Sequence, residues 1–134
     1  MSTVTSEVLA IRTGDDVVRV RQGVRTAASK AGLSLVDQTK IITAASELAR
    51  NTLDYGGGGT ARIELVQEPM RRGVRIIFED QGPGIPDVEQ ALSDGFTTGR
   101  GLGLGLGGSK RLCNEFRIET EAGKGTRVTI ARWR

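Results

Sequence analysis

GVRIIFEDQGPGIP, residues 73–86, is a strand-like segment that ends in an acidic residue and a glycine turn. Its apolar side chains alternate with polar ones, which is the period of a β-strand with one buried face. Val74, Ile76 and Phe78 share that face, and Asp80 falls on it too. Burying a carboxylate is costly unless it is hydrogen-bonded. The pattern therefore predicts that Asp80 either caps a turn or binds a ligand.

Two glycines, Gly82 and Gly84, follow this acid. Because they carry no side chain, another group can approach the backbone closely beside the carboxylate. A flat ligand with an exocyclic amine would hydrogen-bond Asp80 and occupy that space, and adenine is such a ligand. Asp80, Gly82 and Gly84 are therefore a candidate site for such a ligand.

The hydrophobic pattern of the whole chain predicts alternating helices and strands. Helices are expected from Gly14 to Gly32, from Ser34 to the glycines at 56–59, from Pro86 to Gly95 and over residues 106–115, and strands at 4–11, 60–68, 73–80, 116–121 and 126–133. Strands that mostly neighbour one another in sequence, with helices between hairpins, predict an α/β two-layer sandwich (α+β). The expected sheet is mostly antiparallel but mixed, covered on one face by helices, in a single domain over residues 1–134.

Composition excludes several classes of function. The chain has 134 residues, of which 37% are hydrophobic and 26% charged, so it is expected to fold as a globular domain. A net charge of +3 with only 4% aromatic residues does not favour a nucleic-acid surface. Without a signal peptide or a run of 18 apolar residues, we expect a cytoplasmic protein with no membrane partner.

Two residue counts narrow the chemistry further. There is no histidine, which excludes histidine bases, histidine zinc sites and a phosphohistidine acceptor within this chain. There is one cysteine, Cys113, so no disulfide forms within the chain. Cys113 falls in an apolar helical stretch, and we expect it to be a small buried core residue.

The segment SELARN, residues 46–51, places two polar side chains on one helix face. Glu47 and Asn51 are four residues apart and project from the same side of the predicted helix. An asparagine amide oxygen is a ligand for a hard cation, and a carboxylate one turn away can accept a proton or orient a nucleophile. The same spacing is also typical of a solvated helix face, so both interpretations stand at this point.

Glycines alternate with other residues in TTGRGLGLGLGG, residues 97–108, directly before a helical pattern. A glycine-rich loop that leads into a helix presents backbone N–H groups, and the helix dipole favours negative charge there. We expect Gly101, Gly103 and Gly105 to give phosphates access to the loop, with the amides through Leu106 binding them. The stretch lacks the GK[ST] ending of a P-loop and does not follow a strand as a Rossmann glycine motif does.

Taken in order, the motifs ExxxN, DxGxG and GxGxGL resemble those of the ATP-binding superfamily of gyrase, Hsp90, histidine kinases and MutL, called the GHKL or Bergerat fold. The resemblance extends over nearly the whole chain. It implies ATP and Mg²⁺ as cofactors, with Glu47 as the catalytic base and Asn51 as the Mg²⁺ ligand. It further implies that Asp80, flanked by Gly82 and Gly84, binds adenine, that Gly101, Gly103 and Gly105 form the phosphate loop, and that Thr126 supports the adenine pocket.

Longer stretches are similar to the anti-sigma-factor type serine-protein kinases, namely SELARN, EDQGPGIPD, DGFTTGRGLGLGL and KRLCNEF. Within that family the chain is most similar to the switch kinase of the stressosome. This implies an ATP-dependent protein serine/threonine kinase of a partner-switching stress pathway. It also implies a STAS-domain antagonist as the substrate and a PP2C-type phosphatase that the kinase activates by binding.

Within this resemblance, we expect residues 97–105 to close over the phosphates as a lid, with Thr97 and Thr98 among the nucleotide contacts. Arg100 either reaches the γ-phosphate or is merely solvated. The chain has Asp54 where histidine kinases usually carry lysine, and the glycines at 56–59 offer no side-chain contact to a nucleotide.

Two other functions stay open. One is a nucleotide-gated anti-sigma module that binds its partner without catalysis, and the other is a detached histidine-kinase ATPase domain. The absence of histidine argues against autophosphorylation in cis. Retention of Glu47 favours catalysis over binding alone, because a pure binder needs no base.

Overall fold

The computed structural model describes residues 2–85, 87–92 and 105–134 of the chain. Its strands are β1 (Ser2–Ile11), β2 (Gly59–Gln67), β3 (Arg72–Asp80), β4 (Glu115–Glu121) and β5 (Gly125–Trp133). Its helices are α1 (Gly14–Lys30), α2 (Leu35–Asp54), α3 (Val88–Leu92) and α4 (Gly105–Arg111). Strands β2, β3, β4 and β5 lie within a residue or two of the predicted ranges.

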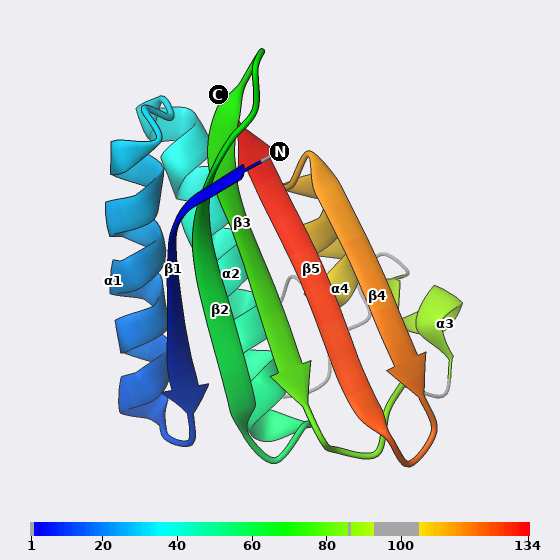
Figure 1. Cartoon of the computed structure of the whole chain (residues 1–134). Coiled ribbons are helices and arrows are strands. Elements are labelled where there is room, and N and C mark those ends of the chain that lie inside the picture. The colour runs from blue at the N-terminus through cyan, green and yellow to red at the C-terminus, as the bar shows by residue number, and fades with distance from the viewer. Residues whose placement is uncertain (1, 86, 93–104) are drawn as a thin grey trace.

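The strands form one five-stranded sheet in the order β1-β2-β3-β5-β4, and helices α1, α2 and α4 lie behind it (Figure 1). This arrangement confirms the predicted two-layer α/β fold. All four pairings of neighbouring strands are antiparallel, so the described part of the sheet is not mixed. The reason is that two tight hairpins, β2–β3 and β4–β5, supply four of the strands, and β5 returns beside β3 in the opposite direction.

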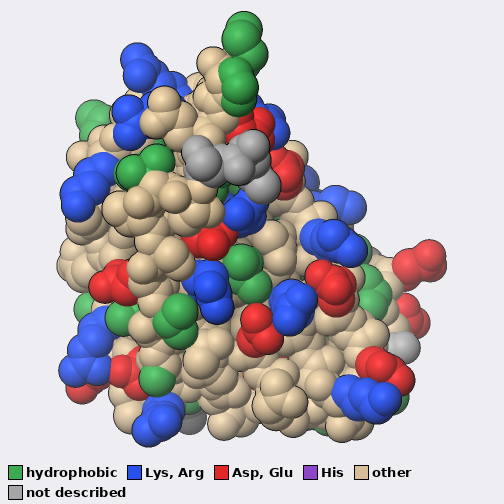
Figure 2. Space-filling model, in the orientation of Figure 1, with side chains coloured by type: hydrophobic (Ala, Val, Ile, Leu, Met, Phe, Trp, Pro, Cys, Tyr) green, Lys and Arg blue, Asp and Glu red, His purple; other side chains and the backbone are tan. Residues whose placement is uncertain are grey.

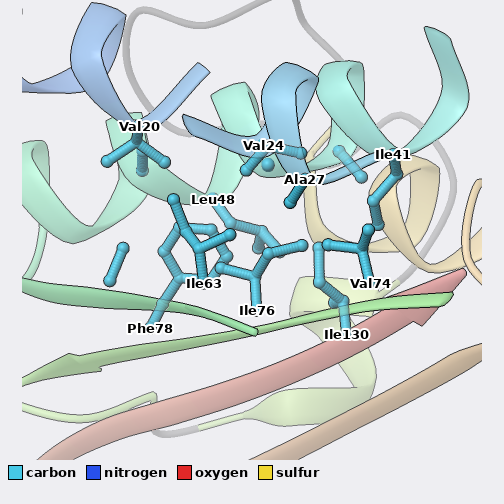
Figure 3. Packing of buried hydrophobic residues seen from close by; sticks show 14 of the residues in the cluster. Val20, Val24, Ala27, Ile41, Leu48, Ile63, Val74, Ile76, Phe78 and Ile130 are labelled. Atoms are coloured by element: carbon cyan, nitrogen blue, oxygen red, sulfur yellow. The ribbon is translucent and has the colours of Figure 1, made fainter. Parts of the chain in front are cut away.

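The core lies between the sheet and the two long helices (Figure 3). Val20 and Val24 of α1 and Leu48 of α2 point toward the sheet, where they meet Ile76 and Phe78 of β3 (Figure 3). The alternation in β3 that the sequence shows is therefore the alternation of a half-buried strand. Its far end, at Asp80, brings a carboxylate to the edge of this core.

Capping side chains fix where the two long helices begin. Thr13 and Asp16 form a capping box at the start of α1. Ser34 caps α2, because its hydroxyl accepts the backbone N–H of Asp37 at 3.1 Å. The Asp37 carboxylate accepts hydrogen bonds from Arg132 of β5.

The last helix is shorter than predicted. We expected it to run to Glu115, but α4 ends at Arg111 and Glu115 already begins β4. Cys113 consequently lies after the helix and is only partly buried, which corrects the prediction of a buried helical core residue. Its thiol donates to the backbone carbonyl of Ser109 at 3.3 Å, and burial raises the pKa of the thiol to about 12.

The opposite face of the sheet carries acidic and basic side chains side by side (Figure 2). Arg75 of β3 pairs with Glu64 of β2 at 2.7 Å, and Arg127 of β5 lies 3.4 Å from Glu79. Both charges of such a pair come from neighbouring strands, which is the favourable cross-strand arrangement. Of the helices in the described ranges, none is long and apolar enough to cross a membrane.

Candidate functional site

A pocket of about 310 Å³ opens where α2 and β3 end and where α4 begins. Parts of the chain that are far apart in sequence line it: α2, the turn after β3, the α3 region, the start of α4, and β5. Seven of the residues singled out from the sequence lie in its lining: Glu47, Asn51, Asp80, Gly84, Gly105, Leu106 and Thr126. The three sequence motifs therefore converge on one cavity.

The helix face that carries Glu47 and Asn51 faces this pocket, not solvent. The whole residue Glu47 is only 4% exposed, and Asn51 is half-buried. The reason is that α2 lies against the sheet with α1 and α4 packed beside it. The alternative of a solvated helix face is therefore wrong for Glu47. A buried carboxylate beside an amide oxygen is an arrangement suited to proton abstraction next to a bound cation.

Asp80 caps a turn and also lines the pocket, so its position fits both roles that the sequence left open. Its Oδ1 accepts the backbone N–H of Gly82 at 2.9 Å, so the side chain caps the turn after β3. The residue also lines the pocket, so its carboxylate is available to a ligand. Gly82 itself does not line the pocket. It contributes by holding one carboxylate oxygen in place.

Thr126 of β5 lies opposite Asp80 in the antiparallel ladder. Its hydroxyl is 3.0 Å from the hydroxyl of Thr120 in β4. The Thr120 hydroxyl also accepts the N–H of Ile85 at 2.9 Å, which ties the turn after β3 to the sheet. These bonds join β4, β5 and the turn after β3 to one another at this end of the pocket.

The turn after β3 needs glycine at residue 84. Gly84 has φ = +79°, and a Cβ built there would lie 2.6 Å from the backbone oxygen of Glu121. An L-residue is disfavoured at that φ, and the close approach leaves no room for a side chain. Gly84 therefore allows the turn to pack against the end of β4.

The glycine-rich segment is described only from Gly105 onward. Gly105 and Leu106 begin α4 and line the pocket, as expected for residues near a phosphate loop. The other predicted members of that loop, Thr97, Thr98, Arg100, Gly101 and Gly103, lie outside the described residues.

Tyr55 and Gly56 are among the pocket residues that the sequence analysis did not assign to the site. Tyr55 follows Asn51 by one turn, and its N–H donates to the Asn51 carbonyl at 2.9 Å. Burial and the negative charges of Asp54 and Glu47 hold the pKa of the Tyr55 hydroxyl above its usual value. Tyr55 follows Glu47 and Asn51 at the same interval of four residues, so this spacing could have identified it as a residue on the same helix face. Gly56, next in the chain, also lines the pocket although it has no side chain.

A family model described as histidine kinase-, DNA gyrase B- and HSP90-like ATPase matches residues 36–134. The chain belongs to this ATPase family. The matched range begins in the first turn of α2 and includes every residue assigned to the pocket. Membership in this ATPase family implies the use of ATP.

Curated relatives place the chain more closely within the ATPase family. The serine/threonine-protein kinase RsbT of Bacillus subtilis is 48% identical over 123 residues, which is 92% of each chain. The anti-sigma F factor of Clostridium novyi is 32% identical over 99 residues, 69% of this chain and 68% of the relative. These matches confirm the predicted resemblance to the anti-sigma-factor type kinases and the predicted enzyme class, a protein serine/threonine kinase.

Two solved structures share the fold. One contains the RsbU and RsbW domains of a Mycobacterium tuberculosis protein, with a TM-score of 0.66 and 21% identity, over 96% of this chain and 32% of that one. The other is the mycobacterial sensor histidine kinase MprB, with a TM-score of 0.55 and 19% identity, over 96% and 97% of the two chains. At these identities the likeness shows the ATPase fold and nothing finer.

Proposed function

We propose that this chain transfers the γ-phosphoryl group of ATP to a serine or threonine hydroxyl of a partner protein. The observation that carries the proposal is the burial of Glu47 beside Asn51 in a pocket that also contains Asp80. A module that only binds nucleotide needs no proton acceptor in its pocket, whereas transfer to a hydroxyl group does. A catalytic base gives that carboxylate a use.

In this proposal Asp80 recognises the base of the nucleotide. One of its oxygens is already held by the N–H of Gly82, which leaves the other to accept the exocyclic amine of adenine. Thr126, opposite it in the sheet, completes that end of the pocket. A charge-assisted hydrogen bond of this kind selects adenine over guanine, which presents a carbonyl oxygen at the corresponding position.

The donor set fits Mg²⁺. Magnesium usually keeps several waters and takes only one or two protein oxygens, with nucleotide phosphates supplying the rest. Asn51 offers one amide oxygen in the pocket, and the described ranges contain no group of three or more His, Cys, Asp or Glu that could hold a metal by themselves. When bound, the ion would neutralise charge on the phosphates.

Glu47 has the catalytic role in this proposal. The partner hydroxyl oxygen attacks the γ-phosphorus, its proton passes to the Glu47 carboxylate, and the bond to ADP breaks. General-base catalysis of this kind contributes about 10² to 10⁴ in rate. The predicted phosphate contacts of Thr97, Thr98, Arg100, Gly101 and Gly103 remain part of the same proposal.

The proposed partner is a STAS-domain antagonist, and the proposed second partner is a PP2C-type phosphatase that the free kinase activates by binding, in the cytoplasm. The 48% identity to a serine/threonine-protein kinase over 92% of each chain supports a kinase that acts on another protein. The identity to an anti-sigma F factor supports partner switching, and it also keeps a non-catalytic sequestering module as the second candidate.

The experiment is a transfer assay with radiolabelled ATP, Mg²⁺ and a cognate STAS-domain protein. The chain by itself should acquire little label, and adding the STAS protein should give acid-stable, alkali-labile phosphoserine or phosphothreonine on that partner. Acid-labile label on a partner histidine would support the histidine-kinase alternative. Tight nucleotide-dependent binding without any label would support the sequestering module.

A further inference from the structure

Gly56 lies against the side chain of Asp80. A Cβ built on Gly56 would be 2.5 Å from the Cβ and Cγ of Asp80 and 2.6 Å from its Oδ2. Real Cβ atoms essentially never come closer than 3.0 Å to such neighbours. The end of α2 therefore reaches the acid of β3 only because residue 56 has no side chain.

Gly82 lies close to both Gly56 and the Asp80 carboxylate. Its Cβ would lie 2.8 Å from the Cα of Gly56, 2.9 Å from the Gly56 oxygen and 3.1 Å from Oδ1 of Asp80. The N–H of Gly82 also donates to that Oδ1 at 2.9 Å. Backbone from the end of α2 and backbone from the turn after β3 therefore meet at the Asp80 carboxylate.

Gly57, the residue after Gly56, makes no such contact with Asp80. Gly57 has φ = +74°, and a Cβ built there would have nothing within 4 Å. Gly57 is explained by its backbone conformation alone. Gly56 has an ordinary φ, so its lack of a side chain is explained by the approach to Asp80 and the pocket that both residues line.

We propose that Gly56 is a positioning residue: because it has no side chain, the Asp80 carboxylate can keep the orientation that accepts the exocyclic amine of adenine, and residue 56 thereby contributes to the preference for ATP over GTP. This inference rests on the proposed function, because it requires Asp80 to recognise the base. It adds that recognition depends on a residue of the α2 terminus, outside the glycine motif that follows β3.

A methyl group added at residue 56 is expected to act mainly on Asp80, because the nearest atoms that it would meet all belong to that side chain. The Cβ of Asp80 is one of the atoms that a methyl group on residue 56 would meet, so rotation of the Asp80 side chain alone cannot relieve the contact and the carboxylate must shift together with its Cβ. To restore ordinary van der Waals contact the carboxylate must move by about 1 Å, which is enough to break a hydrogen bond whose useful range is a few tenths of an ångström.

The test is a double-mutant cycle with Gly56→Ala, Asp80→Asn and the two combined, each titrated with Mg-ATP, Mg-GTP and Mg-tripolyphosphate by calorimetry. Gly56→Ala should lower ATP affinity about tenfold or more and reduce the ATP-to-GTP preference. Its affinity for tripolyphosphate, which has no base, should stay within about twofold of the wild-type value. The combined variant should bind ATP no more weakly than Asp80→Asn, because residues that act through one contact are not additive.

Gly57→Asn is the matched control, because asparagine tolerates a positive φ and a Cβ at residue 57 would have nothing within 4 Å. This control should bind all three ligands as the wild type does. Wild-type ATP affinity in Gly56→Ala, an equal loss of tripolyphosphate binding, or additive losses in the combined variant would each overturn the role of Gly56. If Asp80→Asn itself binds ATP normally, the adenine assignment in the proposed function is wrong, and the role of Gly56 falls with it.

Discussion

Asp37 in the first turn of α2 and Arg132 near the end of β5 are joined by two hydrogen bonds, of 2.8 and 3.1 Å, although they are 95 residues apart. Arg132 also donates to the carbonyl of Leu112, just after α4. One guanidinium therefore joins the helix that carries Glu47 and Asn51 to the sheet and to the segment that follows α4. It fixes the pocket-lining helix at the end remote from the pocket.

This ion pair predicts how stability depends on pH. Arg132 holds the pKa of the Asp37 carboxyl below its ordinary value of 3.8, so the pair stabilises the fold above that value. The contribution is lost as the pH falls through the lower pKa of the folded state. Asp37→Asn should therefore cost about 1 kcal/mol at neutral pH, or about 4 °C in Tm. The difference from wild type should vanish in acid.

Urea titrations of both proteins between pH 7 and pH 2.5 measure this difference. A stability difference for Asp37→Asn that stays constant down to the lowest pH would contradict the role assigned to the pair.

Cys113 is predicted to be chemically inert in the folded protein. A pKa of about 12 leaves almost no thiolate at pH 8, and the thiolate is the reactive species. Labelling by a disulfide reagent at pH 8 should be roughly a thousandfold slower in buffer than in denaturing urea. Equal rates in the two conditions would show that the thiol is open to solvent in the folded state.

Much of the fold follows from local pattern. The alternation of Val74, Ile76 and Phe78 predicted both β3 and the place of Asp80 at its inner face, because a strand with one buried face has a strict period of two. The helical spacing of buried residues in α1 and α2 was equally informative. Such signals are carried by residues within one element, so they can be found without knowing what the element packs against.

The features that were missed depend on contacts between elements. Gly56 matters because β3 brings Asp80 against the end of α2. The order of residues within α2 or within β3 does not predict this contact between them. The early end of α4 has a similar cause: Asn114 donates its N–H to Ala131 of β5, and the chain enters the sheet instead of extending the helix. Pairing with a strand outweighed the apolar helical pattern there.

The role proposed for Asp80 predicts a selective loss of nucleotide binding. Removing the charge of a hydrogen-bonding partner at a buried site should cost roughly 1.5 to 3 kcal/mol, which is at least about tenfold in affinity. Calorimetry on Asp80→Asn should show this loss for ATP, with GTP remaining a poor ligand. Equal ATP affinity in the two proteins would remove the adenine assignment.

Asn51 is predicted to act on the metal complex. Asn51→Ala removes the amide oxygen proposed to bind Mg²⁺, so it should weaken Mg-ATP much more than ATP measured in the presence of a chelator. The neighbouring Thr52 hydroxyl donates to the Leu48 carbonyl within the helix, so Thr52→Ser serves as a nearby control that keeps this bond. An Asn51→Ala protein with the same preference for Mg-ATP over free ATP would contradict the assignment.

The central claim, that this is a kinase with Glu47 as its base, is tested most directly by single-turnover phosphotransfer in Glu47→Gln. The substitution keeps the shape of a side chain that is almost fully buried and removes its ability to accept a proton. We predict that Mg-ATP affinity changes little while transfer to a STAS-domain partner slows by about 10² to 10⁴. Transfer at the wild-type rate would show that Glu47 is a structural residue of α2, and the non-catalytic binding module would then be the better explanation of this pocket.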